Sequence, residues 1–107
     1  YVKPHRHTDS AKDESLVLLR GTLGAIIFDE FGQVTAARTL RPGMIADVPH
    51  TTFHTWVALE DNTIFFETKA GPYVPLAPEE RAAFAPPEGV PHAPQYLAWL
   101  KTLCPPT

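Results

Sequence analysis

The sequence predicts a small, single-domain, all-β protein with a proline-rich, partly helical C-terminal tail. A length of 107 residues favours one domain. Short apolar runs alternate with turn signals at intervals of roughly 8–12 residues, which is typical of a β-sandwich or β-barrel. The composition shifts at Gly71-Pro72, after which most of the twelve prolines occur. We therefore expect a β-domain over residues 1–73 and a tail over residues 74–107.

The strands of the β-domain can be placed in order along the chain. Residues 15–28 are rich in strand formers but are broken at Gly21 and Gly24. Pro42 and Gly43 suit the two central positions of a type II turn. The expected strands cover residues 16–19, 25–28, 33–40, 44–48, 54–59 and 63–69, with turns at residues 29–32, 41–43 and 61–62.

The tail contains two helical signals. Pro78 followed by Glu79 and Glu80 is typical of a helix start. Residues 95–103 form a plausible short helix, with Leu97 and Leu100 on one side. Because so short a helix is not stable alone, we expect it to dock on the β-domain or on a partner.

Bulk composition limits the classes of function. An apolar fraction of 44% is ordinary for a globular protein, and a net charge of −3 gives no reason to expect nucleic acid or a membrane as partner. No apolar run approaches the ~20 residues of a membrane span. The single Cys104 excludes an intrachain disulfide and, with no visible signal peptide, favours a cytoplasmic location. Since the chain opens at Tyr1 without a methionine, we expect further residues ahead of it.

Four residues suggest a metal site. His5 and His7 lie two apart, so they project from the same face of a strand. Glu14 opens the next apolar run and can point the same way from a neighbouring antiparallel strand. A fourth candidate, His54, follows a turn and a short strand that ends at Pro49.

Three imidazoles and one carboxylate suit a single divalent transition metal, namely Zn, Fe, Mn, Ni or Cu. Four protein ligands would leave one or two positions for water or substrate, as in catalytic metal sites. The alternative is that His5 and His7 are surface histidines near a frayed chain end.

The segment from His5 to Gly21 resembles the first signature motif of the cupin superfamily. That motif reads His-x-His, a short gap, Glu, six residues and Gly. His5, His7, Glu14 and Gly21 match it, although the gap between His7 and Glu14 is longer than usual. We expect this gap, residues 8–13, to form a mobile polar loop beside the metal.

The second segment resembles the second cupin motif, which reads Gly, five residues, Pro-x-Gly, two residues, His, three residues and Asn. Gly43, Pro49 and His54 match it in register. Thr51 stands where the motif has its second Gly, and Ala58 stands where it has Asn. The resemblance implies a small cupin β-barrel, or jelly roll, over residues 1–73, with the two histidines of the first motif, its glutamate and His54 as the metal ligands.

Within the superfamily, the chain is most similar to the WbuC-type cupin-fold metalloproteins. These proteins take their name from bacterial polysaccharide gene clusters, so the resemblance implies a sugar or sugar-nucleotide in bacterial polysaccharide biosynthesis. Glu67, Lys69 and Tyr73 become candidate catalytic residues, because Glu67 and Lys69 share a strand face and Tyr73 could donate a proton. The supporting pieces, which span about two thirds of the chain, are residues 4–7, 14–15, 28–29 with 32, 54–55 and 67–73.

Two classes of function follow. The first is a metalloenzyme acting on a small molecule, as an oxygenase at Fe or Cu or as an isomerase or hydrolase at Mn, Ni or Zn. The second is a non-catalytic cupin that binds or senses a small ligand. A metal-free sugar epimerase is disfavoured, because such cupins do not keep all four metal ligands.

Several residues near these motifs have two interpretations. Trp56 shares parity with His54, which would place it in the cavity wall on a regular strand. The alternative, which we favour, is that Trp56 packs in the core. Lys3 shares parity with His5 and either meets an anionic substrate or lies on the surface. His50 lies near the site or on the surface.

The sequence also predicts a homodimer. Residues 16–19 and 25–28 are apolar on both faces, yet only one face of each strand can fill the interior. A short tail helix covers part of the second face at most. We expect a twofold interface on an outer sheet face that includes Val17, Leu19 and Ile27 or their neighbours of alternate parity.

Overall fold

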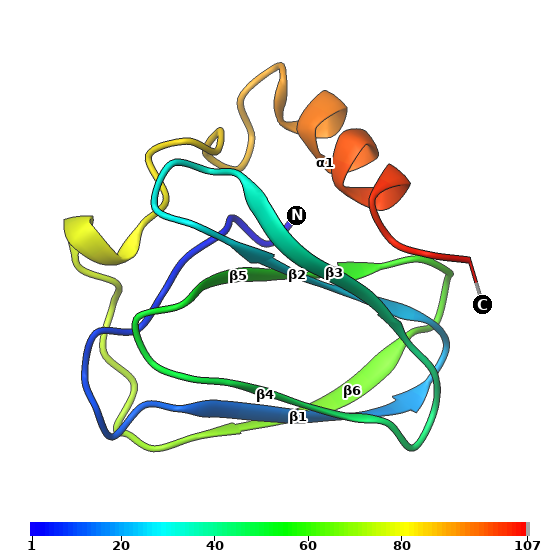
Figure 1. Ribbon diagram of the computed structural model, residues 1–107, viewed down its shortest axis with the longest axis horizontal. Coiled ribbons are helices and arrows are strands. Elements are labelled where there is room, and N and C mark those ends of the chain that lie inside the picture. The colour runs from blue at the N-terminus through cyan, green and yellow to red at the C-terminus, as the bar shows by residue number, and fades with distance from the viewer. Residues whose placement is uncertain (107) are drawn as a thin grey trace.

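The computed structural model, which describes residues 1–106, is mostly β, as predicted. Two three-stranded antiparallel sheets, with the orders β4-β1-β6 and β3-β2-β5, lie one above the other (Figure 1). Each sheet combines strands that are distant in the sequence. The strands are β1 Glu14–Arg20, β2 Leu23–Phe28, β3 Val34–Leu40, β4 Ile45–Val48, β5 Phe53–Ala58 and β6 Ile64–Lys69.

The turns between the strands follow the local sequence. Oδ1 of Asp29 accepts hydrogen bonds from the backbone N–H groups of Phe31 and Gln33, which closes the β2–β3 hairpin. Gly43 has a φ of +91°, and the N–H of the following residue donates to the carbonyl of Arg41 at 3.0 Å. The type II turn expected there is therefore confirmed.

Strand alternation separates two apolar clusters. The first lies between the sheets, and Ile27 packs against it. The second lies on the outer side of the β3-β2-β5 sheet, where Ile26 and Phe28 point away from the first cluster. The buried residues between the sheets are Leu16, Leu18, Leu23, Leu40, Val48 and Trp56.

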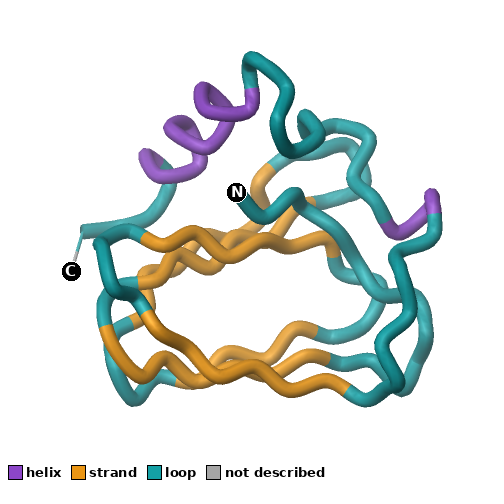
Figure 2. Tube along the Cα trace, turned by 180° about the vertical axis from the view of Figure 1, so that it is seen from behind, coloured by secondary structure: helices purple, strands orange, loops and turns teal. Residues whose placement is uncertain are grey.

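The tail covers this second cluster. Helix α1, Ala93–Thr102, begins two residues before the expected helix and lies over the β3-β2-β5 sheet (Figures 1 and 2). Leu100 is fully buried in the same cluster as Ile26 and Phe28. The helix start expected at Pro78 is only a short 3-10 turn, η1 Pro78–Glu80. Of the two docking places that the sequence allowed, the tail helix therefore uses the chain's own sheet.

The outer face of the β4-β1-β6 sheet stays uncovered by any described segment (Figure 1). Val17 on the central strand pairs with Ile45 on one side and Phe66 on the other. Ile45 is 69% exposed, Phe66 59% and Leu19 57%. The homodimer remains a prediction. Because Ile27 lies between the sheets, it cannot belong to an outer interface, and we now expect the interface on the outer face of the β4-β1-β6 sheet.

Among the described residues, no helix combines the length and apolar character that crossing a membrane requires.

Candidate metal centre

The first two histidines lie on an extended segment beside the start of β5. His5 and His54 exchange two backbone hydrogen bonds, of 3.1 and 2.9 Å. The expected strand is reduced to isolated bridges at His5, because Pro4 has no N–H and Arg6 donates its N–H away from β5 to the carbonyl of Glu80. This short pairing still places the rings of His5, His7 and His54 together, with centroids 4.7–6.1 Å apart.

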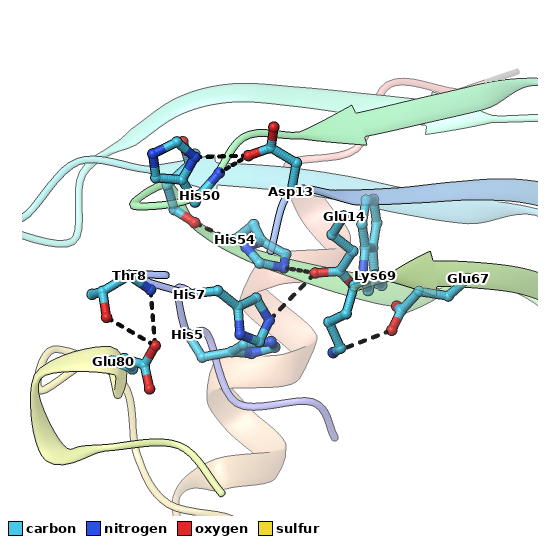
Figure 3. A network of polar contacts seen from close by, with 12 residues as sticks. His5, His7, Thr8, Asp13, Glu14, His50, His54, Glu67, Lys69 and Glu80 are labelled. Carbon is cyan, nitrogen blue, oxygen red and sulfur yellow. Dashed lines mark hydrogen bonds and ion pairs between the residues drawn. The ribbon is translucent and has the colours of Figure 1, made fainter. Parts of the chain in front are cut away.

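Glu14 reaches the cluster from the opposite sheet. It is the first residue of β1, as expected, but β1 pairs with β4 and β6 and not with the histidine segment. The sequence prediction of a neighbouring antiparallel strand is therefore wrong in this detail. The four side chains meet because the ends of the two sheets face each other (Figure 3).

The four side chains can each offer one ligand atom, and these atoms lie within 4.8 Å of one another. Nε2 of His54 is 2.8 Å from Oε2 of Glu14, and Nε2 of His7 is 3.6 Å from the same oxygen. Glu14 and His54 are each 1% exposed and His7 is 8% exposed, whereas His5 is only partly buried. Three of the four side chains are thus buried, and His5 is the most accessible.

Backbone carbonyls orient two of the imidazoles. Nδ1 of His5 lies 2.9 Å from the carbonyl oxygen of Lys3, and Nδ1 of His54 lies 2.9 Å from that of Thr52. With a metal bound, a proton on Nδ1 would donate to the carbonyl and leave Nε2 as the ligand atom, which is the usual arrangement for metal-binding histidines. Nε2 of His7 is buried without a hydrogen-bond partner, so it fits a position completed by a metal ion.

The protonation states also suit a metal. Burial lowers the pKa of His5, and burial together with the charge of Lys69 lowers the pKa of His7. Burial acts to raise the pKa of Glu14, but hydrogen bonds from His54 and Glu67 outweigh it and hold the pKa well below the usual range. Neutral imidazoles and an ionised carboxylate are the forms that bind transition metals.

Trp56 holds the carboxylate from a further side. Its ring is 6% exposed in the cluster between the sheets, and its Nε1–H lies 3.3 Å from Oε1 of Glu14. The sequence favoured core packing for this residue, which is correct. Trp56 also stabilises the carboxylate, because its indole N–H donates to the oxygen of Glu14 that the histidines leave free.

Glu67 and Lys69 share one face of β6, as predicted, and point toward Glu14 (Figure 3). Nζ of Lys69 is 3.6 Å from Oε1 of Glu67. Burial, followed by the hydrogen bond to Glu14 and its negative charge, raises the pKa of Glu67 to about 7. The lowered pKa of Glu14 and the raised pKa of Glu67 therefore place the proton of this pair on Glu67 rather than on Glu14.

This raised pKa links the stability of the metal-free chain to pH. Because the folded-state pKa of Glu67 lies above its ordinary value of 4.5, the protonated carboxyl favours the folded chain. Its contribution is fully present below about pH 4.5 and is lost as the pH rises through 7. His5 and His7 act in the opposite direction, since their lowered pKa values contribute stability above 6.5 that is lost as the pH falls.

A pocket of about 450 Å³ opens beside the cluster. Tyr73, the third candidate catalytic residue, lies in its wall but is 87% exposed. Lys3 does not line this pocket and instead borders another one with Arg81 and Glu88. The lining residues of the pocket beside the cluster are His5, His7, Lys12, Lys69, Ala70, Gly71, Pro72, Tyr73, Val74 and Leu76.

Lys12 was not singled out from the sequence. It belongs to the loop of residues 8–13, which was expected to be mobile and polar. Hydrogen bonds attach this loop at both ends: the N–H of Thr8 donates to Glu80, and Asp13 accepts from the N–H of His50. The mobility of the loop stays a prediction. No local sequence signal indicates the position of Lys12, because these tertiary contacts decide it.

The loop that precedes His54 carries backbone strain. Thr51 has a φ of +69°, a region that favours glycine, and its N–H donates to the carbonyl of His7. Thr51 occupies the position at which the second cupin motif has glycine. His50 points elsewhere, with Nδ1 2.8 Å from Oδ1 of Asp13.

A family model described as a domain of unknown function (DUF6016) matches residues 1–40, which include His5, His7 and Glu14 but not His54. No curated protein and no solved structure matches the chain.

Proposed function

We propose that this chain is a cupin-fold metalloprotein that binds one divalent transition metal through His5, His7, Glu14 and His54. The observation that carries the proposal is the convergence of four ligand atoms within 4.8 Å, drawn from three separate parts of the chain. The orphaned Nε2 of His7 and the two carbonyl-bound imidazoles support it.

We further propose that the two facing sheets form the small jelly-roll barrel of the cupin superfamily. The motif register supports this assignment. Thr51, at the position where the second motif has glycine, has a φ of +69°, in the region that favours glycine. At Gly21, a Cβ atom would clash with Oγ1 of Thr63, so the close packing there requires glycine at the end of the first motif as well.

The site is best suited to a metalloenzyme that acts on a small molecule. A bound metal supplies Lewis-acid or redox chemistry, which corresponds to an isomerase, a hydrolase or an oxygenase. On the protein side, the pKa of Glu67, which lies next to Glu14, is raised to about 7, so this carboxyl can donate or accept a proton at the edge of the site near neutral pH. Lys69 and the Tyr73 hydroxyl border the pocket through which a substrate reaches His5 and His7.

For the substrate we propose a sugar or sugar-nucleotide in bacterial polysaccharide biosynthesis, with the protein in the cytoplasm. The resemblance to WbuC-type proteins supports this context. The alternative is a non-catalytic cupin that binds or senses a small ligand, and the exposure of Tyr73 favours it, since a side chain that is 87% exposed is poorly held for catalysis.

Metal analysis tests the central claim. Protein purified without chelator or nickel resin should contain about one divalent metal ion per chain, and His54→Ala should lose most of it. His92→Ala is the matched control, because His92 is an exposed histidine outside the cluster. Full metal content in a His5→Ala/His54→Ala double variant would contradict the assignment.

Turnover separates the two functional classes. The metal-loaded protein is incubated with a panel of nucleotide sugars, and the products are followed by chromatography. A product whose formation needs the metal and is slowed by Glu67→Gln supports the enzyme. Saturable binding of a panel member with no product supports the binding cupin.

A further inference from the structure

The pocket beside the cluster is built from two segments that approach from different directions. Lys12 belongs to the loop after the histidine segment, and Lys69 ends β6. Nζ of Lys12 donates to the carbonyl of Pro72 at 3.1 Å and also lies close to Gly71. This contact ties the two segments together at the pocket and holds the Lys12 ammonium group in the wall.

The charge of the pocket wall is positive. Lys12 and Lys69 are its two lysines, and none of its lining residues is Asp or Glu. Within residues 1–106, Lys12 takes part in no ion pair, because its contact is with a neutral carbonyl. Lys69 has one acidic neighbour, Glu67, at 3.6 Å. Glu67 is not among the residues that line the pocket, so Lys12 and Lys69 carry the charge of its wall.

The lysines are not simply solvated surface groups. Lys12 is partly buried, and the Lys69 side chain is 32% exposed. His5 and His7 line the same pocket, so both ammonium groups share one space with the accessible side of the histidine cluster. A pocket of about 450 Å³ falls in the size range of sites for small organic molecules.

We propose that this pocket binds a small organic anion whose carboxylate or phosphate group is held by Lys12 and Lys69. The rest of the ligand extends toward His5 and His7. Such an anion would be the substrate class of the proposed function. Any reaction of the bound anion rests on the proposed function, but its binding does not, since the lysines bind the anionic group without the metal. An ammonium group donates up to three hydrogen bonds and attracts either anion as a point charge.

Three probes with the same sugar ring separate the possibilities: glucose 6-phosphate, glucuronate and glucose. Binding to the metal-free, chelator-treated full chain is measured by isothermal titration calorimetry and repeated on the zinc-loaded protein. The anions should bind and neutral glucose should bind at least about tenfold more weakly, which corresponds to 1.4 kcal/mol. A preference for glucose 6-phosphate identifies a phosphate site, and a preference for glucuronate a carboxylate site.

Charge-removing variants locate the site. Lys12→Gln and Lys69→Gln should each raise the dissociation constant of the preferred anion about five- to tenfold, in line with the loss of one charge-assisted hydrogen bond. Lys101→Gln, on helix α1 away from this pocket, removes the same charge and should leave the dissociation constant unchanged. Circular dichroism spectra that match the natural chain show that each variant is folded.

Equal binding of glucose and the two anions would overturn the proposal. So would anion binding that Lys12→Gln and Lys69→Gln leave intact, or no anion binding at millimolar concentration. Failure of the metal proposal looks different. In that case the protein carries no stoichiometric metal, while the metal-free chain still binds the anion through the two lysines.

Discussion

Trp56→Phe removes a hydrogen-bond donor from the cluster of Glu14 and the three histidines while keeping an aromatic ring in the core. The indole N–H of Trp56 lies 3.3 Å from Oε1 of Glu14, a carboxylate that is 1% exposed. A hydrogen bond to a charged group contributes about 1.5–3 kcal/mol. Because 3.3 Å is longer than the usual N–H···O distance, we expect the lower end, about 1.5 kcal/mol.

Two measurements check this expectation. The free energy of unfolding of the metal-free protein, from urea denaturation, should fall by at least about 1.5 kcal/mol. Zinc affinity, from competition with a chelating dye, should fall about tenfold, because Glu14 loses a partner that orients it. Trp99→Phe is the control, since Trp99 is 43% exposed on α1 and should change neither quantity by much. Unchanged zinc affinity in Trp56→Phe would refute the orienting role.

Two further predictions concern pH and assembly. In the metal-free protein, the protonated carboxyl of Glu67 contributes stability that is lost between about pH 4.5 and 7, and Glu67→Gln should remove this contribution. In urea titrations, the free energy of unfolding of the natural chain should therefore fall relative to that of the variant over this pH window. A constant difference would contradict the raised pKa of Glu67. In light scattering, the natural chain should have the mass of a dimer and Ile45→Glu that of a monomer, whereas Phe31→Glu, which alters an exposed apolar residue in a hairpin turn, should remain dimeric. A monomeric natural chain would rule out the dimer.

Much of the secondary structure could be predicted because local rules govern it. Apolar runs and turn residues placed the six strands to within a few residues, and Gly43 adopts the positive φ that its turn requires. The helix start at Pro78 was overestimated, because the proline and two glutamates favour a first turn but the apolar residues that follow do not repeat at helical spacing.

The candidate site was only partly predictable for a related reason. His5 and His7 project together because side chains two apart share a face of any extended segment, whether or not it forms a full strand. The resemblance to the cupin motifs added His54. Nothing local indicated Lys12, whose place depends on how the loop of residues 8–13 contacts Pro72.

The sequence by itself determined the types of side chain, the face that each one occupies on its strand, and the positions at which the chain turns. Only the tertiary structure decided that Glu14 meets the histidines from the opposite sheet, that Trp56 donates to it, and that the tail covers one outer sheet face and leaves Ile45 and Phe66 exposed on the other. The physical reason is that the alternation of side chains along a strand depends only on neighbouring residues in the chain. The hydrophobic effect that brings the sheets together is non-directional, so shape and packing across distant segments select the partners.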